Sequence, residues 1–245
     1  PDQKFAIIDD NSNADLPNVC CLMFAQEQAS YLVGIAAGMM TESNVIGYVQ
    51  GMVFPTMNLF GIGFIEGILS VNPDATILQY NANSFGDAAA GATAVKNFVT
   101  QGADVVYHAA GGTGAGVITG CQENGIYAIG VDADQSYLAP ETVITSAMKG
   151  LYPTTVDTLT DVVVNGNWDK YAGKVATLGL VSGENPEANY VQIPMESTQW
   201  SDTFTKDDYK ALVKGMFDGS IKVSNDISAE PATTNVNVEY LGNLK

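Results

Sequence analysis

The sequence predicts an α/β protein built from two doubly wound lobes. Short apolar runs alternate with longer amphipathic segments between residues 5 and 165. Alternation at this spacing is typical of parallel strands joined by helices that cover both faces of a sheet. The runs are too numerous for one small sheet, which indicates a second lobe. The chain is expected to leave one lobe near 41–44 and to return near Gly150.

These two crossings assign ranges to the lobes. Residues 1–44 and 150–182 are expected to form the amino-terminal lobe, which would be incomplete because its first strands are absent. Residues 45–149 are expected to form the carboxy-terminal lobe. Residues 183–245 hold a crossover and a tail, and their lobe is left open. The arrangement predicts a ligand cleft between the carboxyl ends of two sheets.

Strands are predicted where the apolar runs are short. They lie at 5–8, 19–24, 45–49, 76–80, 104–109, 127–131, 143–148 and 174–181. The first, Phe5–Ile8, is expected to be buried and to stop at the polar residues Asp9–Ser12. After Gly166 the alternation weakens. Residues 183–192 are polar and hairpin-like, and residues 236–241 would form an edge strand.

Helices are predicted where apolar residues recur every three or four positions. They lie at 26–40, 58–71, 87–100, 114–124, 152–165 and 206–218. In the first of them, Tyr31, Ile35 and Met39 share one face. Asp87 stands at the start of the third, where an aspartate side chain can cap free backbone N–H groups.

Charge and cysteine content exclude several classes of partner and site. The 245 residues carry a formal net charge of −17 and include no arginine. Such acidity repels nucleic acid and anionic membrane surfaces, so neither is expected as a partner. Cys20, Cys21 and Cys121 are expected to be buried thiols, because no spacing fits a zinc site or a redox pair. We expect no cofactor and no metal.

Three strand ends carry the residues that best fit a binding site. Ligands bind outside the carboxyl ends of strands in open α/β sheets. Gly111 and Gly112 end one strand, and glycines there let backbone N–H groups approach a ligand. Asp132 ends the next strand and could accept hydrogen bonds from two adjacent hydroxyls. Lys149 ends the third. These groups suit a polar small molecule that carries hydroxyls.

Each of these residues also has a simpler interpretation. The glycine turn could be a tight turn with no ligand, and its spacing is not the dinucleotide pattern because the third glycine comes one residue early. Asp134 shares a strand face with Asp132, but it also fits a turn former or a helix cap. Lys149 could be a solvated surface charge.

An aromatic residue and a histidine complete the candidates. Phe85 lies on a polar loop before a helix, where it could stack on a flat base or simply cap the helix. His108 lies within an apolar strand, which favours a core or supporting role over catalysis. No serine lies in a nucleophile elbow, and no pair of carboxylates or Cys–His pair stands out. We therefore expect a binding protein, not an enzyme.

Seven segments resemble the basic membrane protein family, of the purine nucleoside receptor A type. They are Phe5–Asp9, Ser30–Gly34, the stretch from Tyr80 through Ser84–Asp87, Gly102–Val106, Ala109–Gly114, Ile129–Ser136 and Thr145–Lys149. They cover roughly the first 150 residues in the order of the family. The run from Gly111 to Gln135 is fairly specific, and the resemblance is weak after Gly166.

The resemblance implies a fold, a function and roles for the candidate residues. Family members are substrate-binding lipoproteins of ABC importers, with a fold like that of type I periplasmic binding proteins. By resemblance, Phe85 would stack on a purine, Asp132 and Lys149 would hold the ribose, and Gly111 and Gly112 would line the pocket. Partners would be a purine nucleoside and a membrane permease. The full-length protein would be a monomer, lipid-anchored outside the cytoplasm.

The sequence also departs from the family. The family's amino-terminal segment, which carries the lipidated cysteine and a second aromatic base contact, has no counterpart here, and Gly150 replaces a basic residue. Two other functions remain open: a nucleotide- or NAD-dependent enzyme of doubly wound fold, and a receptor lobe for another sugar-like ligand.

Overall fold

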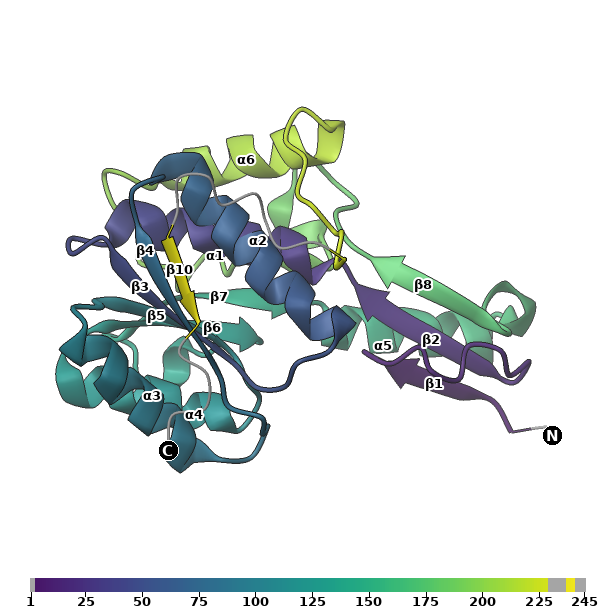
Figure 1. Cartoon of the computed structure of the whole chain (residues 1–245). Helices are drawn as coiled ribbons and strands as arrows, with labels where there is room; N and C mark the ends of the chain where they lie inside the picture. The colour runs from purple at the N-terminus through teal and green to yellow at the C-terminus, as the bar shows by residue number, and fades with distance from the viewer. Residues whose placement is uncertain (1–2, 229–236, 241–245) are drawn as a thin grey trace.

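A computed structural model describes residues 3–228 and 237–240 and contains two sheets (Figure 1). The larger sheet has seven strands in the order β10-β4-β3-β5-β6-β7-β9. Their bounds are β3 Val45–Gln50, β4 Thr76–Asn81, β5 Val105–Ala109, β6 Tyr127–Asp132, β7 Val143–Lys149, β9 Val191–Gln192 and β10 Asn237–Tyr240. Every pairing is parallel except that of β7 with β9.

Helices cover both faces of the larger sheet. Helices α1 (Gln26–Met40) and α2 (Pro55–Val71) pack on one face, and α3 (Ala88–Thr100) and α4 (Thr113–Asn124) pack on the other (Figure 1). Helix α6 (Lys206–Asp218) adds its buried residues to the core on the side of α1. The parallel sheet with helices on both faces confirms the predicted fold class.

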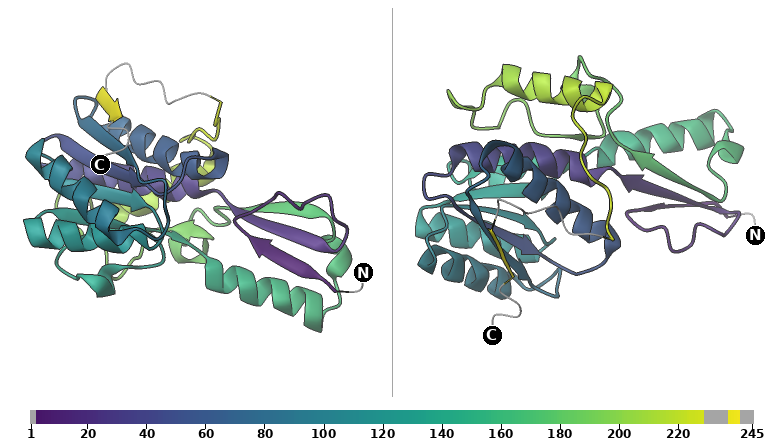
Figure 2. Two further views of the ribbon diagram at one scale, coloured as in Figure 1. Left: turned by 60° about the horizontal axis from the view of Figure 1, so that its bottom comes forward. Right: turned by 45° about the horizontal axis from the view of Figure 1, so that its top comes forward.

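The smaller sheet has three parallel strands in the order β1-β2-β8. They are β1 (Phe5–Ile8), β2 (Val19–Phe24) and β8 (Lys174–Leu178), and α5 (Leu151–Leu159) lies along them (Figure 2). The expectation that the first strand is buried was wrong, since Phe5 is 49% exposed. β1 is an edge strand, so it has a neighbour on one side only.

Three connections join the two sheets and run side by side. They lie between β2 and α1, between β7 and α5, and between β8 and β9. The N–H of Ala25 donates to the carbonyl of Leu178 at 2.8 Å. The N–H of Gly150 donates to the carbonyl of Tyr190 at 2.7 Å. These backbone hydrogen bonds tie the connections to one another.

The ranges assigned to the amino-terminal lobe contribute to both sheets. Strands β1, β2 and β8 come from 1–44 and 150–182, whereas α1, which also comes from 1–44, packs on α2 and the larger sheet. Gly34 permits this packing, since a Cβ atom there would overlap the carbonyl of Phe64 on α2. The division of the whole chain into two lobes stays a prediction.

Several element boundaries differ from the sequence prediction for local reasons. Helix α2 begins at Pro55 because proline fits the first helical position, which needs no N–H donor. The predicted helix 152–165 gives way at Thr160 to a π-helical turn that ends at Val164. The hairpin expected at 183–192 is absent. A short helix and β9 stand there, and β9 pairs with β7.

Other local predictions are confirmed. The Asp87 side chain caps α3 by accepting the N–H of Ala90 at 2.9 Å. β10 is the edge strand predicted near the carboxyl end. The three cysteines are buried and free. Short 3-10 turns lie at Ser136–Leu138, Trp168–Lys170 and Pro186–Ala188.

Candidate functional site

A cavity of about 300 Å³ opens where the two sheets meet. Strand ends and the first turn of α2 supply its walls. Its lining residues are Asp9, Gln26, Phe54, Thr56, Met57, Phe60, Phe85, Ala109, Ala110, Gly111, Val131, Asp132 and Lys149. Small-molecule sites in α/β proteins have this location and are mostly apolar with a few polar groups.

Lys149 connects the two sheets through two carboxylates. Its Nζ lies 2.8 Å from Oδ2 of Asp9, which follows β1, and 3.2 Å from Oδ1 of Asp132, which ends β6. The lysine side chain is only 5% exposed. Its ammonium also lies 4.8 Å from the centroid of the Phe60 ring. Apolar contact on one side and two carboxylates on the other hold the ammonium in the cavity wall.

Asp9 and Asp132 both have a backbone conformation that residues other than glycine rarely adopt. Asp9 has φ +64° and Asp132 has φ +66°. Aspartate tolerates this left-handed region better than most residues, and such strain is concentrated at binding and catalytic sites. In each residue Oδ1 is buried and accepts no hydrogen bond. Oδ1 of Asp132 is within ion-pair range of Lys149 but not aligned for a hydrogen bond. The two side chains are nevertheless 39% and 44% exposed, so each carboxylate can present an oxygen to a ligand hydroxyl.

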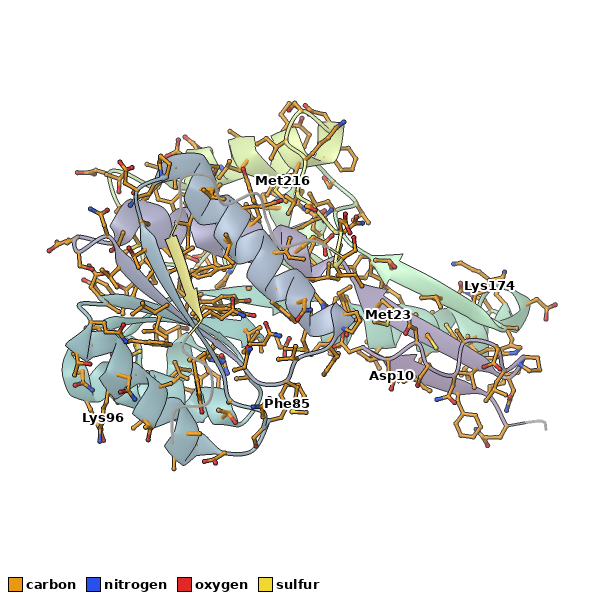
Figure 3. All side chains as sticks on the ribbon, viewed as in Figure 1. Asp10, Met23, Phe85, Lys96, Lys174 and Met216 are labelled. Atoms are coloured by element: carbon orange, nitrogen blue, oxygen red, sulfur yellow. The ribbon has the colours of Figure 1, made fainter. Side chains whose placement is uncertain are left out.

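Two aromatic rings flank the cavity. Phe85 on the loop after β4 and Phe54 before α2 are 43% and 39% exposed. Their ring centroids lie 6.4 Å apart and the rings meet edge to face. Figure 3 labels Phe85 on the side of the larger sheet that faces the junction. Gly51 makes room for it, because a Cβ atom there would overlap the Phe85 ring. Exposed rings at a cavity can stack on a flat ligand.

Not every predicted residue lines this cavity. Phe85, Gly111, Asp132 and Lys149 converge on it. Gly111 has φ +55°, a conformation that glycine adopts at no steric cost. Gly112 does not line it and is instead the N-cap residue directly before α4.

Asp134 lies outside the cavity lining, and its carboxylate accepts hydrogen bonds from two serine residues. Its Oδ2 accepts the Ser197 hydroxyl at 2.6 Å, and its Oδ1 accepts the N–H of Ser136 at 3.0 Å. Partial burial would raise the pKa of Asp134, but these hydrogen bonds outweigh it and lower the pKa below its usual value. The contacts fit the turn-forming interpretation of Asp134.

His108 is buried in β5, behind the cavity. Burial lowers its pKa to about 4, although the nearby Asp132 opposes the shift, so the ring is neutral near pH 7. A Cβ atom on Gly114 would overlap this ring, so the glycine of α4 gives the histidine its space. The position agrees with a core or supporting role.

Sequence reasoning missed most of the cavity lining, including Asp9, Gln26, Phe54 and Phe60. Asp9 had the same signal as Asp132, a carboxylate directly after an apolar strand, and could have been found by the same rule. Of the other three, Gln26 begins α1, Phe54 is the N-cap of α2 and Phe60 lies in the second turn of α2. Only the packing of α2 against the junction brings them to the cavity.

Neither a metal cluster nor a membrane span was found in the described part of the chain. Within residues 3–228 and 237–240, no group of three histidine, cysteine or acidic side chains could hold a metal ion. No helix in those residues is both long and apolar enough to cross a bilayer.

Comparison with known proteins assigns the chain to a family. The family model described as "ABC transporter substrate-binding protein PnrA-like" matches residues 1–216. This chain belongs to the Bmp family. The resemblance found in the sequence is thereby confirmed, and Bmp proteins are substrate-binding proteins of ABC transporters.

Curated relatives in the Bmp family cover the chain in part. Basic membrane protein B of Borreliella burgdorferi is 34% identical over 189 residues, which is 75% of this chain and 55% of the relative. The CD4+ T-cell-stimulating antigen of Listeria monocytogenes is 38% identical over 142 residues, 55% of this chain and 40% of the relative. The chain thus spans about half the length of the curated relatives it matches.

A solved structure supports the same assignment. The ABC transporter solute-binding protein from Aeropyrum pernix superposes with a TM-score of 0.69 at 26% identity. The match covers 93% of this chain and 66% of that protein. The fold of this Bmp chain is that of a periplasmic binding protein of type I.

Proposed function

We propose that this chain captures a purine nucleoside as part of the substrate-binding protein of an ABC importer. One observation carries the proposal: two exposed aromatic rings and a lysine held between two carboxylates line the same cavity. A purine offers a flat face to the rings, and a ribose offers neighbouring hydroxyls to the charged groups. No simpler sugar would use both halves of the cavity.

Each residue has a defined role in this proposal. Phe85 and Phe54 hold the base, each ring contributing roughly 1–3 kcal/mol by stacking. The Asp132 carboxylate accepts a ribose hydroxyl, and Lys149 donates to a second ribose oxygen while it stays paired with Asp9. Gly111 brings the backbone close to the ligand.

The partners follow from the family. A substrate-binding protein delivers its ligand to a membrane permease, and we expect this one to act as a monomer outside the cytoplasm. A lipid anchor on the full-length protein belongs to the same proposal, as do the absence of catalysis and of nucleic-acid binding. Phe54 would provide an aromatic contact to the base beside that of Phe85.

Titration calorimetry of this chain tests the proposal. Adenosine, guanosine and inosine are compared with free ribose, uridine and NAD. We expect heat of binding for at least one purine nucleoside, and much weaker binding of ribose and uridine. Binding of NAD alone, or equal binding of ribose and the nucleosides, would overturn the assignment in favour of a nucleotide enzyme or a sugar receptor.

A further inference from the structure

A second cavity lies between the first turns of α1 and α2 and strands β2 and β8 of the smaller sheet. Its volume is about 310 Å³. Thr56 lines both this cavity and the first one, so the two are neighbours. The remaining lining residues are Asn11, Met23, Phe24, Glu27, Pro55, Leu59, Val175, Thr177, Asn225 and Ile227. Met23, labelled in Figure 3, marks the place where β2 meets the first turn of α2.

Glu27 is the one ionisable side chain among the described residues that line this second cavity. The residue is 5% exposed. Its carboxylate receives a backbone hydrogen bond only from its own residue, and no ion pair joins it to any described neighbour. A buried carboxylate without a cation is costly, so such a group either takes up a proton or meets a positive charge.

Packing of α1 on α2 places Glu27 beside this cavity. Glu27 lies in the first turn of α1, directly after the crossing from β2. Gly63 of α2 packs on its backbone so closely that a Cβ atom on the glycine would overlap the Glu27 carbonyl. The residue lines the cavity together with Leu59 of α2 and with Met23 and Val175 of the smaller sheet. Burial there raises the pKa of Glu27 to about 7.

We infer that this second cavity binds a small organic ammonium ion, with the Glu27 carboxylate as its counter-charge. Apolar groups of Met23, Leu59 and Val175 would contact the carbon atoms of such a ligand. Amide and hydroxyl oxygens of Asn225, Thr56 and other lining residues could accept its N–H groups. A single carboxylate with apolar walls suits an alkylammonium better than a metal ion, which needs more oxygen ligands.

Electrostatics of the surroundings agree with a cationic ligand. The chain as a whole carries a formal charge of −17, which draws cations toward it. Lys149 lies near the Phe24 ring, 5.9 Å from its centroid, but its charge is already outweighed by the two carboxylates of Asp9 and Asp132. The ligand would therefore meet one unbalanced charge, that of Glu27.

Binding of n-propylammonium and of tetramethylammonium to this chain, followed by NMR, tests the inference. The matched neutral probe is n-propanol, and the inorganic controls are sodium and potassium chloride at equal ionic strength. At about pH 8, where Glu27 is ionised, we expect saturable binding of at least one ammonium probe and none of n-propanol. Binding should weaken roughly tenfold or more at about pH 5, because the carboxyl group is then protonated.

Two variants locate the site. Glu27→Gln keeps the shape of the side chain and removes its charge, so it should reduce ammonium affinity at least about tenfold. Glu123→Gln makes the same change of charge on the exposed surface of α4 and should leave the affinity unchanged. Nucleoside binding is measured on the same samples and should persist in Glu27→Gln, so failure of one site is distinguishable from failure of the other.

Three results would overturn the inference. They are full ammonium affinity in Glu27→Gln, an equal response to sodium or potassium chloride, and an affinity that does not change with pH. A melting curve of Glu27→Gln confirms that the variant folds, and the pH series on the unchanged chain keeps the test valid whatever that variant does.

Discussion

The larger and the smaller sheet differ in how completely their side chains are buried. In the larger sheet, helices cover both faces, and Tyr107 on β5 and Phe64 on α2 are fully buried. In the smaller sheet, α5 accompanies the strands, and Phe5 and Val175 remain 49% and 44% exposed. Parallel strands are stable when both faces are covered. Since the central strand β2 is buried throughout, the comparison indicates that the outer strands β1 and β8 contribute less to stability than the strands of the larger sheet.

The larger sheet contributes more lining residues to the cavity than the smaller sheet does. The larger sheet supplies Lys149, Asp132 and Gly111, whereas the smaller sheet supplies Asp9. The ion pair between Lys149 and Asp9 is therefore a contact between a well-buried region and a less-buried one. Substitutions in the two regions should therefore differ in their effects on stability and on binding.

Removing a large side chain from each region should have the most unequal effect. Phe64→Ala should lower the free energy of unfolding by about 3–5 kcal/mol, because it leaves a hole in a close-packed core. Phe5→Ala, on the exposed edge strand, should cost about 1 kcal/mol or less. Urea denaturation measures both. Similar losses in the two variants would mean that β1 is as well packed as the core.

Glu27→Gln tests the junction between the regions. The pKa of Glu27 rises from 4.5 to about 7 on folding, so the folded chain binds a proton that the unfolded chain has released between those pH values. The stability that this proton provides is fully present below about pH 4.5 and is lost as pH rises to about 7. At about pH 8 the variant should be more stable than the parent by up to roughly 3 kcal/mol.

Thermal melting of parent and variant at about pH 4 and about pH 8 makes the comparison. The difference in stability should be small at the lower pH and large at the higher. A constant difference at both values would show that burial does not hold the Glu27 carboxyl group protonated. The melts are made without any amine in the buffer, because an ammonium ligand would stabilise only the parent.

The two carboxylates that contact Lys149 should differ in their effect on nucleoside binding. Asp132→Ala should cost more than about 2 kcal/mol, because ribose hydroxyls lose their acceptor. Asp9→Ala should cost less, since it comes from the less-buried sheet and Lys149 keeps Asp132 as a partner. Calorimetry with the best purine nucleoside gives both values. Retained affinity in Asp132→Ala would refute the ribose assignment.

Phe85→Ala should separate the two halves of a nucleoside. Loss of the ring should weaken purine binding by roughly 1–3 kcal/mol and change the binding of a simple sugar only modestly. Tyr137→Ala, which removes an exposed ring away from the cavity, serves as the control. An equal loss for nucleoside and sugar would show that Phe85 shapes the cavity without stacking on a base.

Most of the larger sheet could be predicted from sequence because its signals are local. The runs that became β5 and β7 are apolar on both faces and end at glycine or lysine, so their boundaries were nearly correct. The burial of Phe5 was mispredicted because strand order decides it, and order is not a local property. The pairing of β9 with β7 escaped prediction for the same reason.

Site residues near the ends of strands could be predicted from the sequence, whereas those at the beginnings of helices could not. Phe85, Asp132 and Lys149 come from strand ends, which the fold class places together. Phe54 and Gln26 reach the cavity because α2 packs tightly on α1 through residues such as Gly63. The close approach of the two helices depends on glycine, which has no side chain. A hydrophobic pattern does not reveal such a contact.

The ion cluster at Lys149 also bears on what the cavity should reject. Two aspartates share one ammonium, so the polar end of the cavity carries an excess negative charge. A phosphate group entering there would meet repulsion that an uncharged sugar avoids. The same arrangement that orients hydroxyls should thus discriminate against phosphorylated forms of the ligand, giving selectivity through charge without any steric barrier.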